Sequence, residues 1–169
     1  MFRKLSLSIV LFLAFSTAVY ADFNDGVFAY AKGDYEKAWQ IMMPLAQSTN
    51  HPYAQYYLGV MFAKGQGVEQ DDKEAISWYL KASKQGVKEA QYRLAQMYSK
   101  GKGVPQDYEA AYAWLKVATY LGHKKSKLAL GPAKEKLTDE QFASAQQLAD
   151  DYIEKYGEAP NLGKKKQGQ

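Results

Sequence analysis

Cysteine is absent from the 169 residues of the chain. Its absence excludes disulfide bonds, thiol catalysis and metal sites built on cysteine. It also excludes a lipid-modified cysteine of the kind that anchors bacterial lipoproteins. The folded chain must therefore be stabilised by the packing of its secondary-structure elements.

Long apolar stretches are scarce as well, and the one that the sequence has, from Leu5 to Val19, lies near its start. Arg3 and Lys4 precede it and small residues lead to Ala21, which is the layout of a secretory signal peptide. We expect cleavage after Ala21, and a periplasmic or secreted mature chain without a membrane span. An uncleaved N-terminal anchor is the alternative. A span needs about 20 apolar residues, however, and this stretch is shorter and interrupted by serines.

A large excess of charge of either sign is also lacking. The whole chain carries a formal net charge of +4, and loss of residues 1–21, which hold two basic residues and no acid, leaves +2. A chain this close to neutral is not predicted to bind nucleic acid on charge alone. The two histidines, His51 and His123, have no ligand-spaced partner. The sequence therefore predicts no metal site, no cofactor and no catalytic triad.

What the sequence does contain is an internal repeat, which becomes visible when the chain is shifted by 36 residues against itself. Such self-similarity is typical of repeat proteins, in which each unit packs on the next. We expect two full repeats, about 54–89 and 90–125. The matched residues include Ala54 with Ala90, Leu58 with Leu94, Gly65 with Gly101, Asp71 with Asp107, Trp78 with Trp114 and Gly86 with Gly122.

Each repeat is predicted to form two antiparallel helices, helix A and helix B. In the first repeat, apolar residues recur at helical spacing over about 51–64, and Gly65 ends this helix A. Asp71 is placed to cap helix B, with Glu74 three residues later as in a capping box. Gly86 ends helix B. The fold class that follows is all-α, an α-solenoid of antiparallel helix pairs.

Weaker copies of the repeat flank these two. We expect a degenerate helix pair before residue 51, a third helix A over about 126–136, and a last helix over about 138–156 that shields the end of the stack. The helical domain then covers residues 22–156. Residues 157–169, rich in glycine and lysine, are predicted to be a disordered basic tail. Its Lys164–Lys166 run is interpreted as solvated, with contact to a polyanion as the alternative.

Four runs of the sequence carry a family resemblance: residues 54–59, 64–68, 75–79, and 100–107 with the helix that follows. They resemble the Sel-one-like repeat (SLR), a relative of the tetratricopeptide repeat with a longer turn between its helices. The resemblance implies a superhelical solenoid and, in many bacterial examples, an exported adaptor protein. SLR proteins share no catalytic motif, so it implies no catalytic residues and no enzyme activity. The chain also lacks the cysteines that link repeats in one SLR subgroup.

Other functions that the motifs could indicate are less favoured. The Lys-Gly-x-Gly-Val runs lack the Gly-Lys-Ser/Thr ending of a phosphate-binding loop and lie between helices. Asp71 and Asp107 could be paired catalytic carboxylates, but their equivalent places favour helix capping. Tyr56 and Tyr92 could form an aromatic shelf for a sugar, yet they too are equivalent, which favours packing between repeats.

A binding surface is expected where outward-facing residues differ between the repeats, since the residues that pack one repeat on the next should be the same in both. By analogy with tetratricopeptide folds, helix A of each repeat lines a concave groove. The groove is predicted to be locally basic and to bind an acidic segment or a free carboxyl terminus of a protein partner. Ordinary solvated helix faces are the alternative. The candidate groove residues are Tyr57, Val60, Lys64, Arg93, Gln96 and Lys100.

The sequence thus predicts an exported protein–protein interaction module of the bacterial cell envelope that is not an enzyme. A structural subunit of an envelope machine is one alternative. A cell-wall or glycan hydrolase is another, and it would need a cleft holding a carboxylate of raised pKa.

Overall fold

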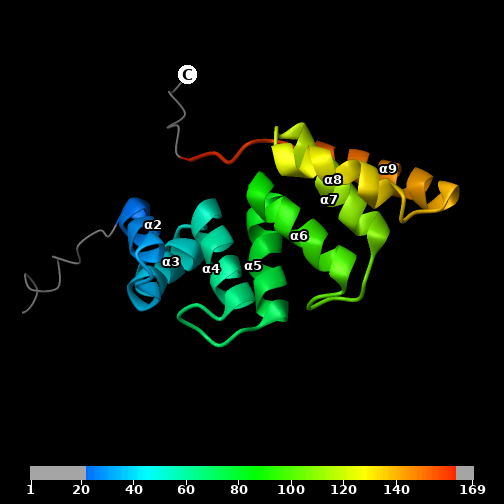
Figure 1. Ribbon diagram of the computed structural model, residues 1–169. Coiled ribbons are helices and arrows are strands. Elements are labelled where there is room, and N and C mark those ends of the chain that lie inside the picture. Colours follow the sequence, from blue (N-terminus) through cyan, green and yellow to red (C-terminus); the bar gives the residue numbers. More distant parts are fainter. Residues whose placement is uncertain (1–21, 163–169) are drawn as a thin grey trace, which may run out of the picture.

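A computed structural model describes residues 22–162 of the chain, and this part contains helices and no strands. Figure 1 shows helices joined by short turns and stacked side by side, which confirms the predicted all-α solenoid. The signal peptide predicted for residues 1–21 lies outside the described residues. The helices are α2 (Phe23–Ala31), α3 (Tyr35–Ser48), α4 (Pro52–Lys64), α5 (Asp72–Lys84), α6 (Lys88–Lys100), α7 (Tyr108–Tyr120), α8 (Lys124–Lys134) and α9 (Asp139–Tyr156).

The helix ends follow the residues that mark them in the sequence. The Asp71 carboxylate accepts hydrogen bonds from the first turn of α5, the shorter of them 2.8 Å, and the Asp107 carboxylate accepts one of 2.9 Å at the start of α7. Gly65 and Gly101 end α4 and α6 in the left-handed conformation, with φ of 64° and 66°. The predicted helix pairs are thus delimited by N-caps and glycines at equivalent places.

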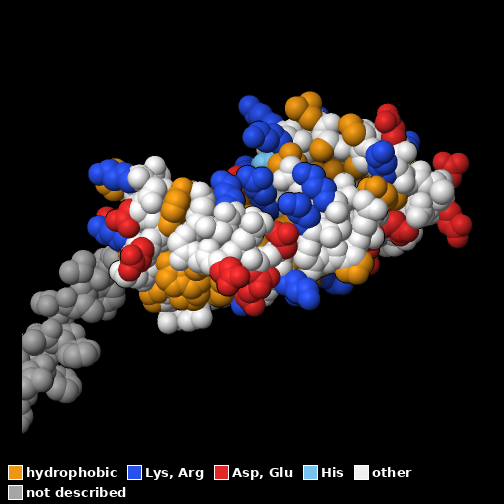
Figure 2. All heavy atoms as spheres, turned by 60° about the horizontal axis from the view of Figure 1, so that its bottom comes forward, with side chains coloured by type: hydrophobic (Ala, Val, Ile, Leu, Met, Phe, Trp, Pro, Cys, Tyr) orange, Lys and Arg blue, Asp and Glu red, His pale blue; other side chains and the backbone are white. Residues whose placement is uncertain are grey.

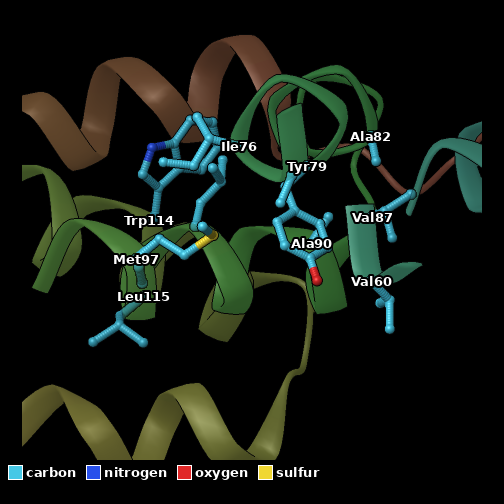
Figure 3. Packing of buried hydrophobic residues seen from close by; sticks show 12 residues of the cluster. Val60, Ile76, Tyr79, Ala82, Val87, Ala90, Met97, Trp114 and Leu115 are labelled. Atoms are coloured by element: carbon cyan, nitrogen blue, oxygen red, sulfur yellow. The ribbon is translucent and has the colours of Figure 1, made fainter. Parts of the chain in front are cut away.

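The core lies between the helices and is built from small and large side chains in alternation. Alanines at the helix contacts, such as Ala75 and Ala111, are buried and let the backbones approach. Trp78 and Trp114 fill the space between them and are 6% and 2% exposed. Figure 3 shows Ile76, Met97 and Trp114, from α5, α6 and α7, meeting in this core. The buried residues form two apolar clusters, one around Trp78 and one around Trp114, and the partly buried Tyr30 and Phe62 pack against both.

Helix α9 does not shield the end of the stack, contrary to the sequence-based expectation. It packs against α7 instead of pairing with α8. The indole of Trp114 lies 4.6 Å from the ring of Tyr152 and 5.8 Å from that of Tyr156, between ring centroids. The outward face of α8 is left uncovered, with exposed lysines such as Lys124 and Lys127 and the exposed Leu128.

The first residues of the predicted disordered tail are placed against the solenoid. Figure 1 shows the segment after α9 running back over the middle of the molecule. The side-chain amide of Gln91 donates a 3.3 Å hydrogen bond to the Tyr156 carbonyl, and the Glu158 backbone lies beside Gly86. Residues 157–159 of the predicted tail therefore contact the solenoid, while residues 163–169, with the lysine run, lie outside the described part. Within residues 22–162, no helix combines the length and apolar character that crossing a bilayer requires.

Candidate functional site

Cavities lie in a row on the face formed by α4, α6 and α8, which we call the helix-A groove. The first, of about 180 Å³, lies between α4 and α6, and the second, of about 260 Å³, lies between α6 and α8. A third, shallower cavity of about 470 Å³ lies at the N-terminal ends of α6 and α8. Gln96 lines all three, so they form one continuous depression.

Helix positions one repeat apart supply the walls of this groove. The first cavity is lined by Val60, Ala63, Lys64, Asp72, Tyr79, Arg93, Gln96, Met97, Lys100 and Lys102. The second is lined by Tyr92, Ala95, Gln96, Ser99, Lys100, Tyr108, Ala111, Leu115, Ala129, Pro132, Ala133 and Lys136. The third is lined by Tyr56, Glu89, Tyr92, Arg93, Gln96, His123, Lys124 and Lys125.

The structure brings all of the predicted groove residues except Tyr57 to the first cavity. Val60 contributes little surface to that cavity, because its side chain is 5% exposed and belongs to the core. Tyr57 lies toward the N-terminal end, where its ring packs against Tyr30 and Phe23 with centroids 5.1 and 6.0 Å apart. The polar candidates therefore share one site, whereas the two apolar candidates serve packing.

A hydrogen-bonded chain orients the polar side chains of the groove. The Arg93 guanidinium donates a 3.2 Å bond to the Gln96 side-chain carbonyl, and the Gln96 amide donates a 3.2 Å bond to the Tyr92 hydroxyl. A guanidinium has five N–H donors in a planar fork. One of them goes to Gln96, and the others can bind an oxygen ligand in the cavity. The arrangement holds Arg93 along the groove floor.

Positive charge dominates the groove. Figure 2 shows lysine and arginine side chains gathered over the middle of one face of the molecule. Asp72 and Glu89 are the acidic residues that line the three cavities. The basic residues that line them are Lys64, Arg93, Lys100, Lys102, Lys124, Lys125 and Lys136.

Several groove residues were not predicted from the sequence. Tyr79 belongs to helix B, but its ring crosses to α4 because Gly59 leaves room for it, and burial raises its pKa above the usual value of 10.0. Lys102 comes from the turn between Gly101 and Gly103. The repeat register contains a signal for the third helix: residues 129, 132, 133 and 136 lie one period after groove residues of α6.

Other side chains that could carry chemistry are occupied in helix capping. Asp71 and Asp107 accept backbone hydrogen bonds, as described above. The Nδ1 atoms of His51 and His123 accept hydrogen bonds of 3.2 Å from the backbone amides of Ala54 and Ser126, at the starts of α4 and α8. In the part of the chain that the structure describes, no three His, Asp or Glu side chains are placed to hold a metal ion.

The chain is similar in sequence and in fold to known helical repeat proteins. The family model of the Sel1 repeat matches residues 52–87 and 88–123. Comparison with curated proteins gives no match. One similar solved structure is c5321, a protective antigen present in uropathogenic Escherichia coli strains that displays an SLR fold, with 30% identity, a TM-score of 0.77 and 85% of this chain covered. Another is a Sel1 repeat protein from Oxalobacter formigenes, with 26% identity, a TM-score of 0.64 and 78% of this chain covered. This chain covers 32% and 55% of the lengths of those two proteins.

Proposed function

The chain carries two Sel1 repeats within an SLR solenoid, and on this premise we propose that it is an exported protein-binding module of the bacterial cell envelope whose partner lies in the helix-A groove. Sel1 repeats generally mediate protein–protein interaction, and their scaffolds are typically non-catalytic. The proposal adds a location, the envelope, and a binding face.

One observation carries the binding face: Lys64, Arg93 and Lys100 line a single cavity between two successive repeats. With Lys102 they make four basic residues against one acid, Asp72, in the lining of that cavity, and this excess of positive charge attracts an anion. An acidic segment or a free carboxyl terminus of a partner would supply that anion. Charge-assisted hydrogen bonds from the guanidinium and ammonium groups would hold its carboxylates.

We predict that Arg93→Ala combined with Lys100→Ala weakens capture of the partner at least about tenfold, which corresponds to about 1.4 kcal/mol. A few residues usually supply most of the binding energy of an interface, and these two carry charge at the centre of the groove. The measurement is affinity capture from envelope extract, quantified by mass spectrometry against the unaltered protein. Circular dichroism should show an unchanged fold, since Arg93 is only half-buried and Lys100 is exposed.

Lys84→Ala combined with Lys155→Ala is the matched control. Both lysines are exposed, lie on α5 and α9, and line none of the three groove cavities. Loss of the partner from this control, with retention by the groove variant, would place the binding face elsewhere.

Export has its own test. A fusion of residues 1–21 to a reporter should carry the reporter across the inner membrane, and the processed protein should begin at Asp22. N-terminal sequencing of the protein from a fractionated cell measures both. Recovery of Met1 on a membrane-bound protein would contradict the proposal, because a processed signal peptide leaves no anchor behind.

A further inference from the structure

The first two cavities of the helix-A groove are the same structural site in two successive repeats. A shift of 36 residues moves each lining residue of the first cavity, except Lys102, onto a lining residue of the second. Lys64 moves onto Lys100, and Lys100 moves onto Lys136. The cavities share Gln96 and Lys100, so they are adjacent. The groove therefore contains two equivalent pockets, one repeat apart.

The chemistry of the pocket changes between the two copies. Where the first cavity has Arg93 and Gln96, the second has Ala129 and Pro132. Asp72 is likewise replaced by Tyr108. The second cavity is therefore lined mainly by apolar and aromatic side chains, together with Gln96, Ser99 and two lysines. Its volume of about 260 Å³ admits a single large side chain.

We infer, on the basis of the proposed function, that the partner is an extended acidic segment that places a carboxylate in the first cavity and a bulky apolar side chain in the second. The first cavity lies on one side of α6 and the second on the other, so the two are offset by about one helix diameter, roughly 10 Å. A polyproline-II segment rises about 3.1 Å per residue with three residues per turn. Residues three apart therefore point the same way and lie about 9 Å from each other, which matches the offset.

The probes are fluorescein-labelled peptides of about ten residues in a proline- and serine-rich background that favours the extended conformation. Each carries one glutamate and one phenylalanine, and the spacing between them is varied in both directions. Fluorescence anisotropy with the purified protein measures Kd. We expect the tightest binding at a spacing of about three residues. Glu→Gln or Phe→Ser in the best peptide should weaken binding at least about tenfold.

A swap variant, which carries groove residues of one repeat in the next, tests which cavity binds which side chain of the partner. Ala129→Arg with Pro132→Gln gives the second cavity the side chains of the first, at a half-buried and an exposed position of α8. This variant should prefer a second glutamate over phenylalanine by at least about tenfold. Ala143→Arg, at an exposed position on α9, adds the same charge away from the groove and should leave the preference unchanged. Circular dichroism checks the fold of each variant.

The inference would be overturned by an affinity that does not depend on the spacing, by a swap variant that keeps its preference for phenylalanine, or by the absence of peptide binding. A best spacing of about seven residues would indicate a helical partner and also overturn it, since two turns of helix span nearly the same distance. Failure of the proposed function is a separate result. If capture depends on Arg93 and Lys100 while the peptides show no spacing preference, the proposed function stands and this inference falls. If capture of the partner does not depend on Arg93 and Lys100, the proposed function is wrong.

Discussion

At the scale of residues, packing between helix A and helix B depends on matched sizes. Gly59 on α4 lies against the ring of Tyr79 on α5, and a Cβ at Gly59 would come within 2.6 Å of that ring. In the next repeat the equivalent residues are Ala95 and Leu115, so a larger residue on helix A faces a smaller one on helix B. Cores tolerate such exchanges when the total volume is kept. The pairs are therefore alternative solutions to one packing constraint.

We predict that Gly59→Ala lowers the free energy of unfolding by about 1–3 kcal/mol through overpacking, despite the better helix propensity of alanine. Adding Tyr79→Leu, which reproduces the pair of the second repeat, should restore part of that loss. Urea denaturation of the two single variants and the double variant gives the coupling free energy. Strict additivity of the two changes would mean that the ring and residue 59 do not compete for space.

At the scale of elements, the helix starts use two kinds of cap. Asp71 and Asp107 were expected from the sequence, because a carboxylate before an apolar stripe is a common N-cap. His51 and His123 were weighed in the sequence as metal ligands or triad members, yet their rings cap α4 and α8 and pack on Phe23 and Tyr92, respectively. Residue type alone could not predict this role, since a histidine caps only when its unprotonated nitrogen faces the helix amides.

We predict that the protein loses stability as the pH falls below the usual histidine pKa of 6.5. Burial lowers the pKa of His51 and of His123 in the folded state, and nearby Lys88, Lys125 and Arg93 lower that of His123 further. Between the lowered pKa and 6.5, the unfolded chain binds more protons than the folded chain. The free energy of unfolding therefore decreases with decreasing pH across that window.

Thermal melts from about pH 7.5 to about pH 5.5, on either side of the usual histidine pKa, measure this slope. His51→Asn combined with His123→Asn keeps a capping side chain at both helices and removes both histidines of the sequence. The double variant should show a flatter pH dependence over this range. An unchanged slope would assign the effect to carboxylates.

At the scale of the whole molecule, the repeats could be predicted from the sequence, whereas the packing of the C-terminal segment on the stack could not. The period of 36 residues sets the caps, the core and most groove positions, since each repeat uses the same local contacts. The contacts of α9 with α7, and of residues 157–159 with Gly86, join segments outside that period, so no periodic signal marks them. The second cavity keeps that register, but Ala129 and Pro132 differ in type from Arg93 and Gln96, so residue identity does not mark the groove in α8.

We predict that Gly86→Ala destabilises the protein more than Gly122→Ala does. Both glycines have a left-handed backbone, with φ of 80° and 81°, so both changes incur about 1–2 kcal/mol of backbone strain. At Gly86 a Cβ would also overlap the Glu158 carbonyl, whereas at Gly122 no atom lies within 4 Å. Urea denaturation of both variants measures the difference. Repeating the comparison in a chain that ends at Tyr156 should abolish it, and a difference that persists would mean that the tail is not its cause.

The return of α9 and residues 157–159 to the middle of the stack bears on how the protein folds. Contacts in a solenoid are mostly local, so such arrays can unravel from an end, one repeat at a time. Here the hydrogen bond between Gln91 and Tyr156 joins residues 65 apart in the sequence, which raises the contact order and slows folding. Unfolding should be correspondingly more cooperative, because freeing the second repeat requires release of the C-terminal segment. During synthesis, the first two repeats therefore lack these contacts until residues 139–158 have left the ribosome.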